Sequence, residues 1–147
     1  MGVFLAPMAG VTDLPFRILA REYGADLVVS EMISAQALVY DNRKTLQMLT
    51  LADRERPAAI QIFGHDPKVC AEAAKIVFDR VAPEMVDLNF GCPTPKIVKN
   101  GDGAALMQNV KLLGQVASAV VEAVPVPVTA KIRLGWDYSS IVALELA

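Results

Sequence analysis

The chain has 147 residues, of which 54% are hydrophobic and 20% charged, and its formal net charge is −2. This composition predicts a globular domain with a substantial core and excludes a disordered or fibrous chain. The charge balance excludes a basic chain, so a nucleic-acid role would require a local basic patch or a further domain. No apolar run has the length of a membrane span and no signal-peptide pattern opens the chain, so we expect a cytoplasmic protein with no membrane partner.

The N-terminal segment predicts a strand, a loop and an amphipathic helix. The apolar run at residues 3–6 is the expected strand. Thr12 or Asp13 can cap the helix that follows, whose apolar residues recur with helical spacing over 16–23. Gly24 supplies the C-terminal stop.

The same order then repeats along the chain. The apolar run 26–30 predicts a second strand, and Ser34 can cap a helix that extends through Tyr40. Residues 41–44 form a polar break before a short helix over 45–51. The apolar run 58–63 predicts the third strand.

The second half of the chain continues the alternation. The expected elements are a helix that starts at Asp66–Pro67 and is closed by Pro83, a strand over 85–88, a helix capped by Asn109 and ended by Pro125, a strand over 128–132, and a helix from Ser139 or Ser140 to Ala147. Between 88 and 109 we expect a long glycine-containing loop.

Five apolar strands that alternate with helices indicate an α/β fold with a parallel sheet. An open doubly wound sheet and a TIM (β/α)8 barrel both fit this order. Polar residues follow every strand, which favours the rim of a barrel, whereas an open sheet concentrates them at its switch point. Because a complete barrel has about 250 residues, we expect the chain to form its N-terminal part, about five βα units.

The residues at the strand ends would converge at the mouth of such a barrel. They are Ala6 to Ala9, Ser30, Glu31, Gln61, Asn89, Cys92, Lys131 and Arg133. Amides, a thiol, cations and a closely approaching backbone suit a flat, hydrogen-bonding ligand with an anionic region. Any one of these residues could simply cap a strand end in solvent, but their recurrence after five strands favours a site.

Cys92 is the most specific candidate for chemistry. It lies beyond its strand, between Gly91 and Pro93, where a loop can present the sulfur to a ligand. It could act as a nucleophile or as a proton donor, and no histidine lies near it in sequence as an activating base. Cys70 is expected in the core, and two such cysteines form neither a disulfide framework nor a metal site.

Lys131 has two possible roles. At the end of a barrel strand it could form a Schiff base if burial depressed its pKa, and Arg133 would assist. The same two residues could instead bind an anionic cofactor.

Several other polar residues have ordinary explanations. His65 is expected to be a solvated residue at a helix entry, and residues 101–103 a turn. Asp87 and Glu31 are possible site carboxylates, although no spacing rule selects them as a pair. Solvated charges are the expected role of Arg17, Arg21, Lys96 and Lys99.

Four motifs together resemble the flavin-dependent tRNA-dihydrouridine synthases, most closely the bacterial B-type. They are Leu5 to Asp13, Gln61 to Gly64, Asp87 to Lys96 with Gly101, Gly103 and Ala104, and Ala130 to Arg133. The resemblance covers the whole chain, and the Asn-x-Gly-Cys-Pro loop with its trailing glycines is its specific part.

The resemblance implies a TIM-barrel enzyme that uses FMN, recharged by NADPH or NADH, to reduce uridine in tRNA to 5,6-dihydrouridine. Pro7, Met8 and Ala9 would lie against the flavin, with Gln61 and Lys131 bonded to its ring system. Cys92 would be the general acid that protonates C5 of the uracil, and Asn89 and Arg133 would hold the flipped-out base.

The family continues beyond the length of this chain with further barrel units and a helical tRNA-binding domain. We therefore expect residues 1–147 to be a partial FMN-binding catalytic domain, inactive and weak in FMN binding when isolated, and prone to associate through an exposed sheet edge. The alternatives are another flavin-dependent pyrimidine reductase, a Schiff-base lyase that uses Lys131, and a half-barrel with a binding or scaffolding role.

Overall fold

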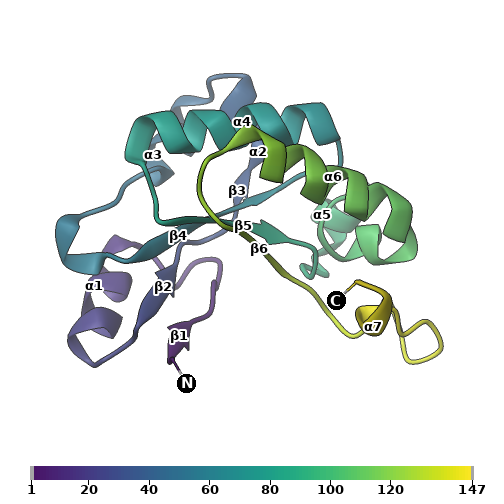
Figure 1. The fold of residues 1–147 in the computed structure, drawn as a ribbon, viewed down its shortest axis with the longest axis horizontal. Coiled ribbons are helices and arrows are strands. Elements are labelled where there is room, and N and C mark those ends of the chain that lie inside the picture. Colours follow the sequence, from purple (N-terminus) through teal and green to yellow (C-terminus); the bar gives the residue numbers. More distant parts are fainter. Residues whose placement is uncertain (1, 147) are drawn as a thin grey trace.

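The computed structural model describes residues 2–146 and shows a parallel sheet covered by helices on one face (Figure 1). The strands are β1 (Phe4–Leu5), β2 (Leu27–Val29), β3 (Ile33–Ser34), β4 (Ala58–Phe63), β5 (Met85–Asn89) and β6 (Val128–Lys131). The helices are α1 (Leu14–Glu22), α2 (Ala35–Val39), α3 (Arg43–Met48), α4 (Pro67–Val81), α5 (Pro95–Lys99), α6 (Val110–Ala123) and α7 (Ala143–Leu146). Two short 3-10 helices are η1 (Asp53–Glu55) and η2 (Gly103–Gln108).

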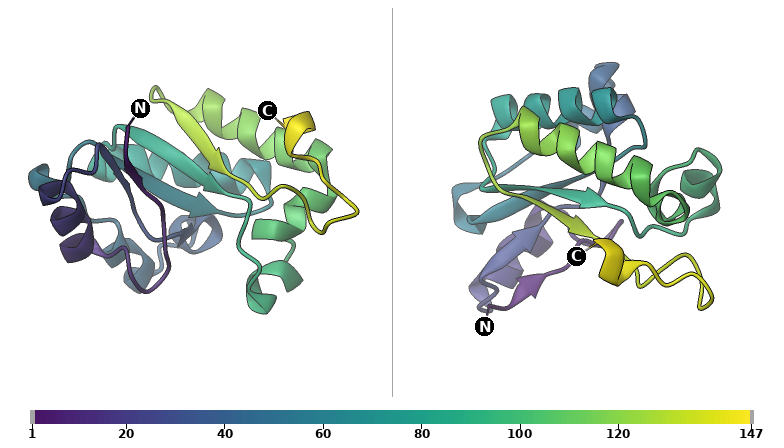
Figure 2. Two further views of the ribbon diagram at one scale, coloured as in Figure 1. Left: turned by 90° about the horizontal axis from the view of Figure 1, so that it is seen from below. Right: turned by 45° about the vertical axis from the view of Figure 1, so that its right-hand side comes forward.

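The sheet has the order β1-β2-β4-β5-β6, and the short strand β3 pairs with the far end of β4. All strand pairs are parallel, so the chain between any two paired strands contains at least one helix. The strands follow one another in sequence order and together form a half-barrel, as the two views in Figure 2 show. An open doubly wound sheet would reverse its strand order at a switch point. The expected partial TIM barrel is therefore confirmed.

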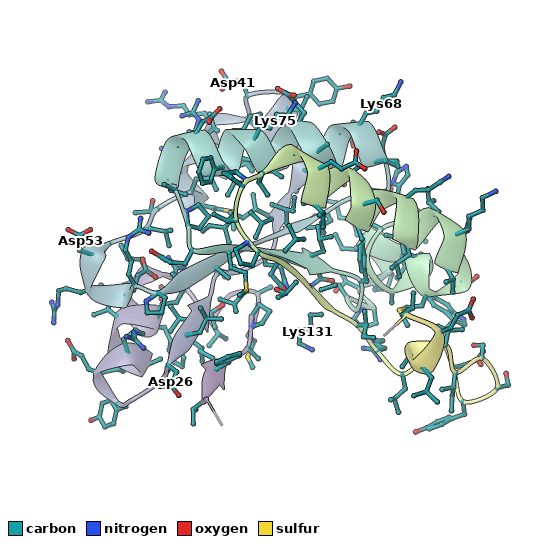
Figure 3. All side chains as sticks on the ribbon, viewed as in Figure 1. Asp26, Asp41, Asp53, Lys68, Lys75 and Lys131 are labelled. Atoms are coloured by element: carbon teal, nitrogen blue, oxygen red, sulfur yellow. The ribbon has the colours of Figure 1, made fainter. Side chains whose placement is uncertain are left out.

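The two faces of the sheet differ because neighbouring strand residues point to opposite sides. On the outer face, Ile60, Ile62, Val86 and Leu88 are buried in the main core against α4 and α6. The inner face carries polar residues at the intervening positions. Figure 3 shows Lys131 on this inner side of the sheet, opposite the layer of α4 and α6.

Side-chain caps begin most of the longer helices where the sequence predicts them. Asp13 accepts the backbone N–H of Phe16 at the start of α1, and Ser34 caps α2. Asp66 and Asn109 do the same for α4 and α6. Each cap satisfies N–H groups that the first helical turn leaves without a partner.

Some element boundaries differ from the sequence-based prediction. The helix expected over 45–51 starts at Arg43, because Asn42 accepts the N–H of Thr45 and so caps it earlier. The segment after β5 contains α5 and η2, whereas its glycines had led us to expect an irregular loop. The last helix begins at Ala143, since Asp137 binds the side chains of Ser139 and Ser140 in a turn instead. The expected end of this helix at Ala147 lies outside the described residues.

The prediction that Arg17 is a solvated charge is wrong. Its guanidinium is buried and pairs with the buried carboxylate of Glu55, with Nε at 2.5 Å from Oε2. Arg17 also donates to the backbone carbonyls of Thr12 and Thr50. This one side chain therefore joins α1 to η1 and to the segment before it. Arg21 is likewise partly buried and donates to the carbonyl of Ala25.

No helix within residues 2–146 is long and apolar enough to cross a membrane.

Candidate functional site

The carboxyl ends of the strands surround a pocket of about 270 Å³ on the inner face of the sheet. It is lined by Pro7, Met8, Ala9, Met32, Gln61, Asn89, Gly91, Cys92, Thr94 and Lys131. These residues come from the loops and ends of β1, β2, β4, β5 and β6. All the residues to which the family resemblance assigns a role in the site, apart from Arg133, line this one pocket, whereas Ser30 and Glu31 line a neighbouring one.

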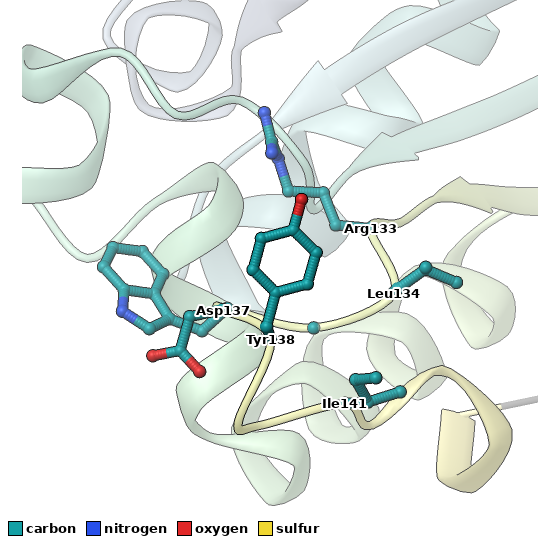
Figure 4. A pocket seen from close by; sticks show the side chains of 7 residues that line it. Arg133, Leu134, Asp137, Tyr138 and Ile141 are labelled. Atoms are coloured by element: carbon teal, nitrogen blue, oxygen red, sulfur yellow. The ribbon is translucent and has the colours of Figure 1, made fainter.

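Arg133 lies beside this pocket and contacts it indirectly. Its Nε donates to the carbonyl oxygen of Gly91 at 2.6 Å, which fixes the arginine against the loop that carries Cys92. Arg133 also lines a neighbouring pocket of about 380 Å³ that is bordered by Trp136 and Tyr138 (Figure 4). The arginine thus stands between the two pockets.

A row of hydrogen-bonded polar side chains crosses the inner face of the sheet beneath the site. The strand register places Gln61 beside Asp87 and Asp87 beside Thr129. Asp87 accepts from Gln61 Nε2 at 2.6 Å and from Thr129 Oγ1 at 2.6 Å. Gln61 Oε1 in turn accepts from Asn89 Nδ2 at 2.9 Å. Three strands are therefore linked by side-chain hydrogen bonds as well as by their backbones.

Asp87 is a member of this row that the sequence marked only as a possible site carboxylate. Burial raises the pKa of its carboxyl above the usual range, although the hydrogen bonds from Thr129 and Gln61 and the charge of Lys131 act in the opposite direction. A signal was present in the sequence, because Asp87 and Asn89 alternate with apolar residues in a strand that is otherwise apolar.

The loop that carries Cys92 is anchored on both sides of the thiol. Asn89 Oδ1 accepts the backbone N–H of Gly91 at 3.2 Å and that of Cys92 at 2.9 Å. The carbonyl oxygen of Cys92 accepts the N–H of Ala104 at 3.0 Å. The Cys92 thiol itself is partly exposed and lies 3.3 Å from the hydroxyl of Thr94.

Gly103 follows this loop at a position where only a glycine fits. Its φ of +59° belongs to the left-handed region, and a Cβ there would lie 2.7 Å from the carbonyl oxygen of Cys92. Any larger residue would push the Cys92 backbone out of place.

His65 is not simply a solvated residue at a helix entry. Its Nδ1 lies 2.8 Å from Asp102 Oδ1, although about half of the imidazole is exposed. Asp102 is buried and directly precedes η2, whose first residues contact Cys92. The pair therefore joins the end of β4 to the segment behind the Cys92 loop.

The loop after β1 forms another wall of the pocket. Thr12 Oγ1 accepts the N–H of Met8 at 3.1 Å, and Glu31 Oε1 accepts the N–H of Gly10 at 2.5 Å. These contacts hold the loop while the side chain of Met8 remains exposed. Glu31, to which the sequence assigned no definite role, thus stabilises one wall of the site.

Within residues 2–146 no three His, Cys, Asp or Glu side chains are grouped to hold a metal ion. The polar groups of the pocket are instead amides, a thiol and an ammonium, which suit an organic ligand with carbonyl and ring-nitrogen groups.

A parallel half-barrel with its polar pocket at the carboxyl ends of the strands places the chain in the class of (β/α)-barrel proteins that build their sites on that rim. The family model described as dihydrouridine synthase (Dus) matches residues 4–147. The chain therefore belongs to the dihydrouridine synthase family.

Curated relatives agree with this assignment. The chain is 47% identical over 136 residues to a probable tRNA-dihydrouridine synthase of Rickettsia bellii, an alignment that covers 92% of this chain and 41% of the relative. It is 47% identical over 135 residues to tRNA-dihydrouridine synthase B of Xanthomonas campestris, covering 92% and 40%. A probable tRNA-dihydrouridine synthase of Treponema pallidum is 43% identical over 150 residues, covering 99% and 44%. The chain thus spans less than half the length of these relatives.

Proposed function

We propose that the complete protein reduces uridine in tRNA to 5,6-dihydrouridine and that Cys92 donates the proton. Family membership and the names of the relatives support the reaction. The observation that carries the assignment of Cys92 is its position, since its partly exposed thiol lines the pocket on a loop fixed at both ends. The buried Cys70 has no access to that pocket.

The residues around the pocket fit an FMN ring system. Lys131 brings an exposed ammonium, and the Gln61 amide has a second N–H beyond the one bonded to Asp87. Pro7, Met8 and Ala9 offer an apolar surface and a backbone edge on the opposite wall. FMN bound here would supply the hydride for the reduction, with NADPH or NADH as the source of its electrons.

The uracil would be held and protonated by groups of the Cys92 loop. Asn89 Nδ2 has one hydrogen beyond its bond to Gln61, and the terminal nitrogens of Arg133 are not used in its bond to Gly91. Both groups can bond to uracil carbonyls. The Cys92 thiol would then pass its proton to C5 of the uracil. The target base must leave the stack to reach this pocket, so we expect it to be flipped out of the tRNA.

The parts of the protein that grip tRNA are proposed to lie outside residues 1–147. The net charge of −2 gives this chain no general attraction to a polyanion, although Lys96 and Lys99 are exposed close to the Cys92 loop. By the family resemblance, three further βα units would complete the barrel and a helical domain would bind tRNA. Residues 1–147 alone would expose two sheet edges and associate through them in solution. We place the protein in the cytoplasm, where tRNA is modified.

Measuring dihydrouridine in tRNA tests this function. In cells that lack their own enzyme, the complete protein should restore dihydrouridine, and Cys92→Ala should lower the rate about 100-fold or more. Cys70→Ala is the matched control, because it removes the buried thiol. Unchanged dihydrouridine with Cys92→Ala would overturn the role of Cys92, and absence of dihydrouridine with the unaltered protein would overturn the reaction.

The same protein separates the alternatives. A Schiff-base lyase requires a buried lysine, whereas Lys131 is exposed, and borohydride should trap no substrate on it. Activity on tRNA without activity on free uracil would exclude a reductase of free pyrimidines.

A further inference from the structure

Asp87 is a buried carboxylate that the proposed function does not use. It lies on the inner face of β5, 6% exposed, and its carboxylate oxygens each accept one hydrogen bond. Neither Asp87 nor Thr129 lines the pocket, whereas Gln61 and Asn89 do. Asp87 therefore cannot contact the ligand directly and can influence the site only through its neighbours.

We propose that Asp87, supported by Thr129, is a positioning residue that sets the direction of the Gln61 and Asn89 amides and so holds the Cys92 loop in place. The chain of contacts runs from Thr129 through Asp87, Gln61 and Asn89 to the N–H of Cys92. Its relevance to catalysis rests on the proposed role of Cys92 as proton donor.

The direction of this chain follows from the chemistry of a carboxylate. An ionised carboxylate only accepts hydrogen bonds, so the Gln61 amide must turn its NH₂ toward Asp87. Gln61 Oε1 then faces Asn89 and must receive the Asn89 NH₂. Asn89 Oδ1 is left to face the loop, where it accepts from both Gly91 and Cys92. A fixed acceptor at one end and two backbone donors at the other thus favour the same orientation of the two amides.

The reversed orientation would release the loop. If Gln61 turned its oxygen toward Asp87, two acceptors would meet and Asn89 would have to rotate as well. The Asn89 NH₂ would then point at the N–H groups of Gly91 and Cys92, which need an acceptor. The acceptor Asp87 excludes this arrangement at one end of the chain of contacts, and the backbone N–H groups of Gly91 and Cys92 exclude it at the other, whereas both amides can adopt either orientation by themselves.

The position of the amides matters for the pocket as well. The same orientation leaves the second N–H of Gln61 and the second N–H of Asn89 as the groups available to a ligand. Sites whose ligand-binding groups are held by a supporting layer of hydrogen bonds keep the geometry that their chemistry needs. Asp87 and Thr129 form such a layer here.

The experiment measures alkylation of the Cys92 thiol by iodoacetamide in the complete protein, which needs neither tRNA nor flavin. Asp87→Asn preserves size but introduces an amide that can donate as well as accept, so both orientations become possible. We expect Cys92 to react at least about fivefold faster, because the loop loses its fixed acceptor part of the time. Cys70 should stay unmodified, which shows that the core is intact.

A matched set of variants completes the test. Asp79→Asn makes the same chemical change on the exposed side of α4 and should leave the alkylation rate unaltered. Thr129→Val removes the hydroxyl bonded to Asp87 and should also speed alkylation, whereas Thr129→Ser keeps that hydroxyl and should not. Alkylation of Cys70 in Asp87→Asn would show that this variant unfolds. The comparison of Thr129→Val with Thr129→Ser then tests the proposal in its place.

The proposal would be overturned if Cys92 were alkylated no faster in Asp87→Asn and in Thr129→Val than in Asp79→Asn. This result would not depend on whether the protein modifies tRNA. Failure of the reaction itself would appear separately, as absence of dihydrouridine with unaltered protein.

Discussion

The side-chain oxygen of Asn89 accepts the backbone N–H of Cys92 at 2.9 Å, so the residue that ends β5 also shapes the loop that follows it. This contact spans only three residues of the chain. Asn89 is only 9% exposed, and its amide is also hydrogen-bonded to Gln61 on the neighbouring strand. A side-chain hydrogen bond therefore joins the end of the strand to the loop that carries the thiol.

Replacing Asn89 tests how much this contact stabilises the fold. Asn89→Ala leaves the N–H groups of Gly91 and Cys92 and the oxygen of Gln61 without their partner. We expect the free energy of unfolding to fall by about 2 kcal/mol, measured by denaturant titration. Asn100→Ala changes an exposed asparagine at the end of α5 and should cost much less. Equal losses in the two variants would contradict the structure.

Because Arg17 and Glu55 form a buried ion pair, we expect that replacing one of them alone strongly destabilises the fold. Arg17→Met leaves the carboxylate of Glu55 buried without its partner. We expect this variant to lose about 3–5 kcal/mol of its free energy of unfolding. Adding Glu55→Leu removes that charge and should restore most of the loss. Arg54→Met breaks the exposed pair with Glu22 and should change stability by less than about 0.5 kcal/mol. Thermal unfolding of the four proteins would decide.

Glu84 predicts a pH dependence of stability. Burial alone would raise the pKa of its carboxyl, but hydrogen bonds from the N–H of Ala58 and from Arg56 outweigh it and bring the pKa below 4.5. Because the carboxyl binds its proton less tightly in the folded state, its contribution is present above about pH 4.5 and is lost as the pH falls through the folded pKa. Glu84→Gln should flatten the acid side of the curve of melting temperature against pH. A curve that keeps its slope would contradict this assignment.

The two thiols should differ strongly in reactivity. Burial raises the pKa of the Cys70 thiol to about 12, with the charges of Asp102 and Asp66 adding to the effect. At about pH 8 almost none of it is the reactive thiolate, while Cys92 is partly exposed. Mass spectrometry after iodoacetamide treatment should find an adduct on Cys92 and none on Cys70. An adduct on Cys70 in folded protein would contradict the packing of α4 against the sheet.

Much of the fold was predictable because it depends on local rules. Apolar runs bounded by proline and glycine gave β4 its bounds, and Asp66 and Asn109 marked helix starts through their capping side chains. The same rules failed around α5 and Ser139. There the outcome depended on contacts that compete with a simple pattern, such as the bonds of Asp137 to two serines.

The sequence by itself determined the order of five strands and the longer helices, the half-barrel class and the residues expected at the rim, since burial period and cap chemistry act over a few neighbouring residues. It did not predict β3, α5, η1 or η2. Only the tertiary structure decided which polar groups meet. Arg17 and Glu55 are 38 residues apart, His65 and Asp102 are 37 apart, and Gln61 and Asp87 are 26 apart. No local pattern encodes such pairs, because each depends on strand register and on how the loops pack across the sheet.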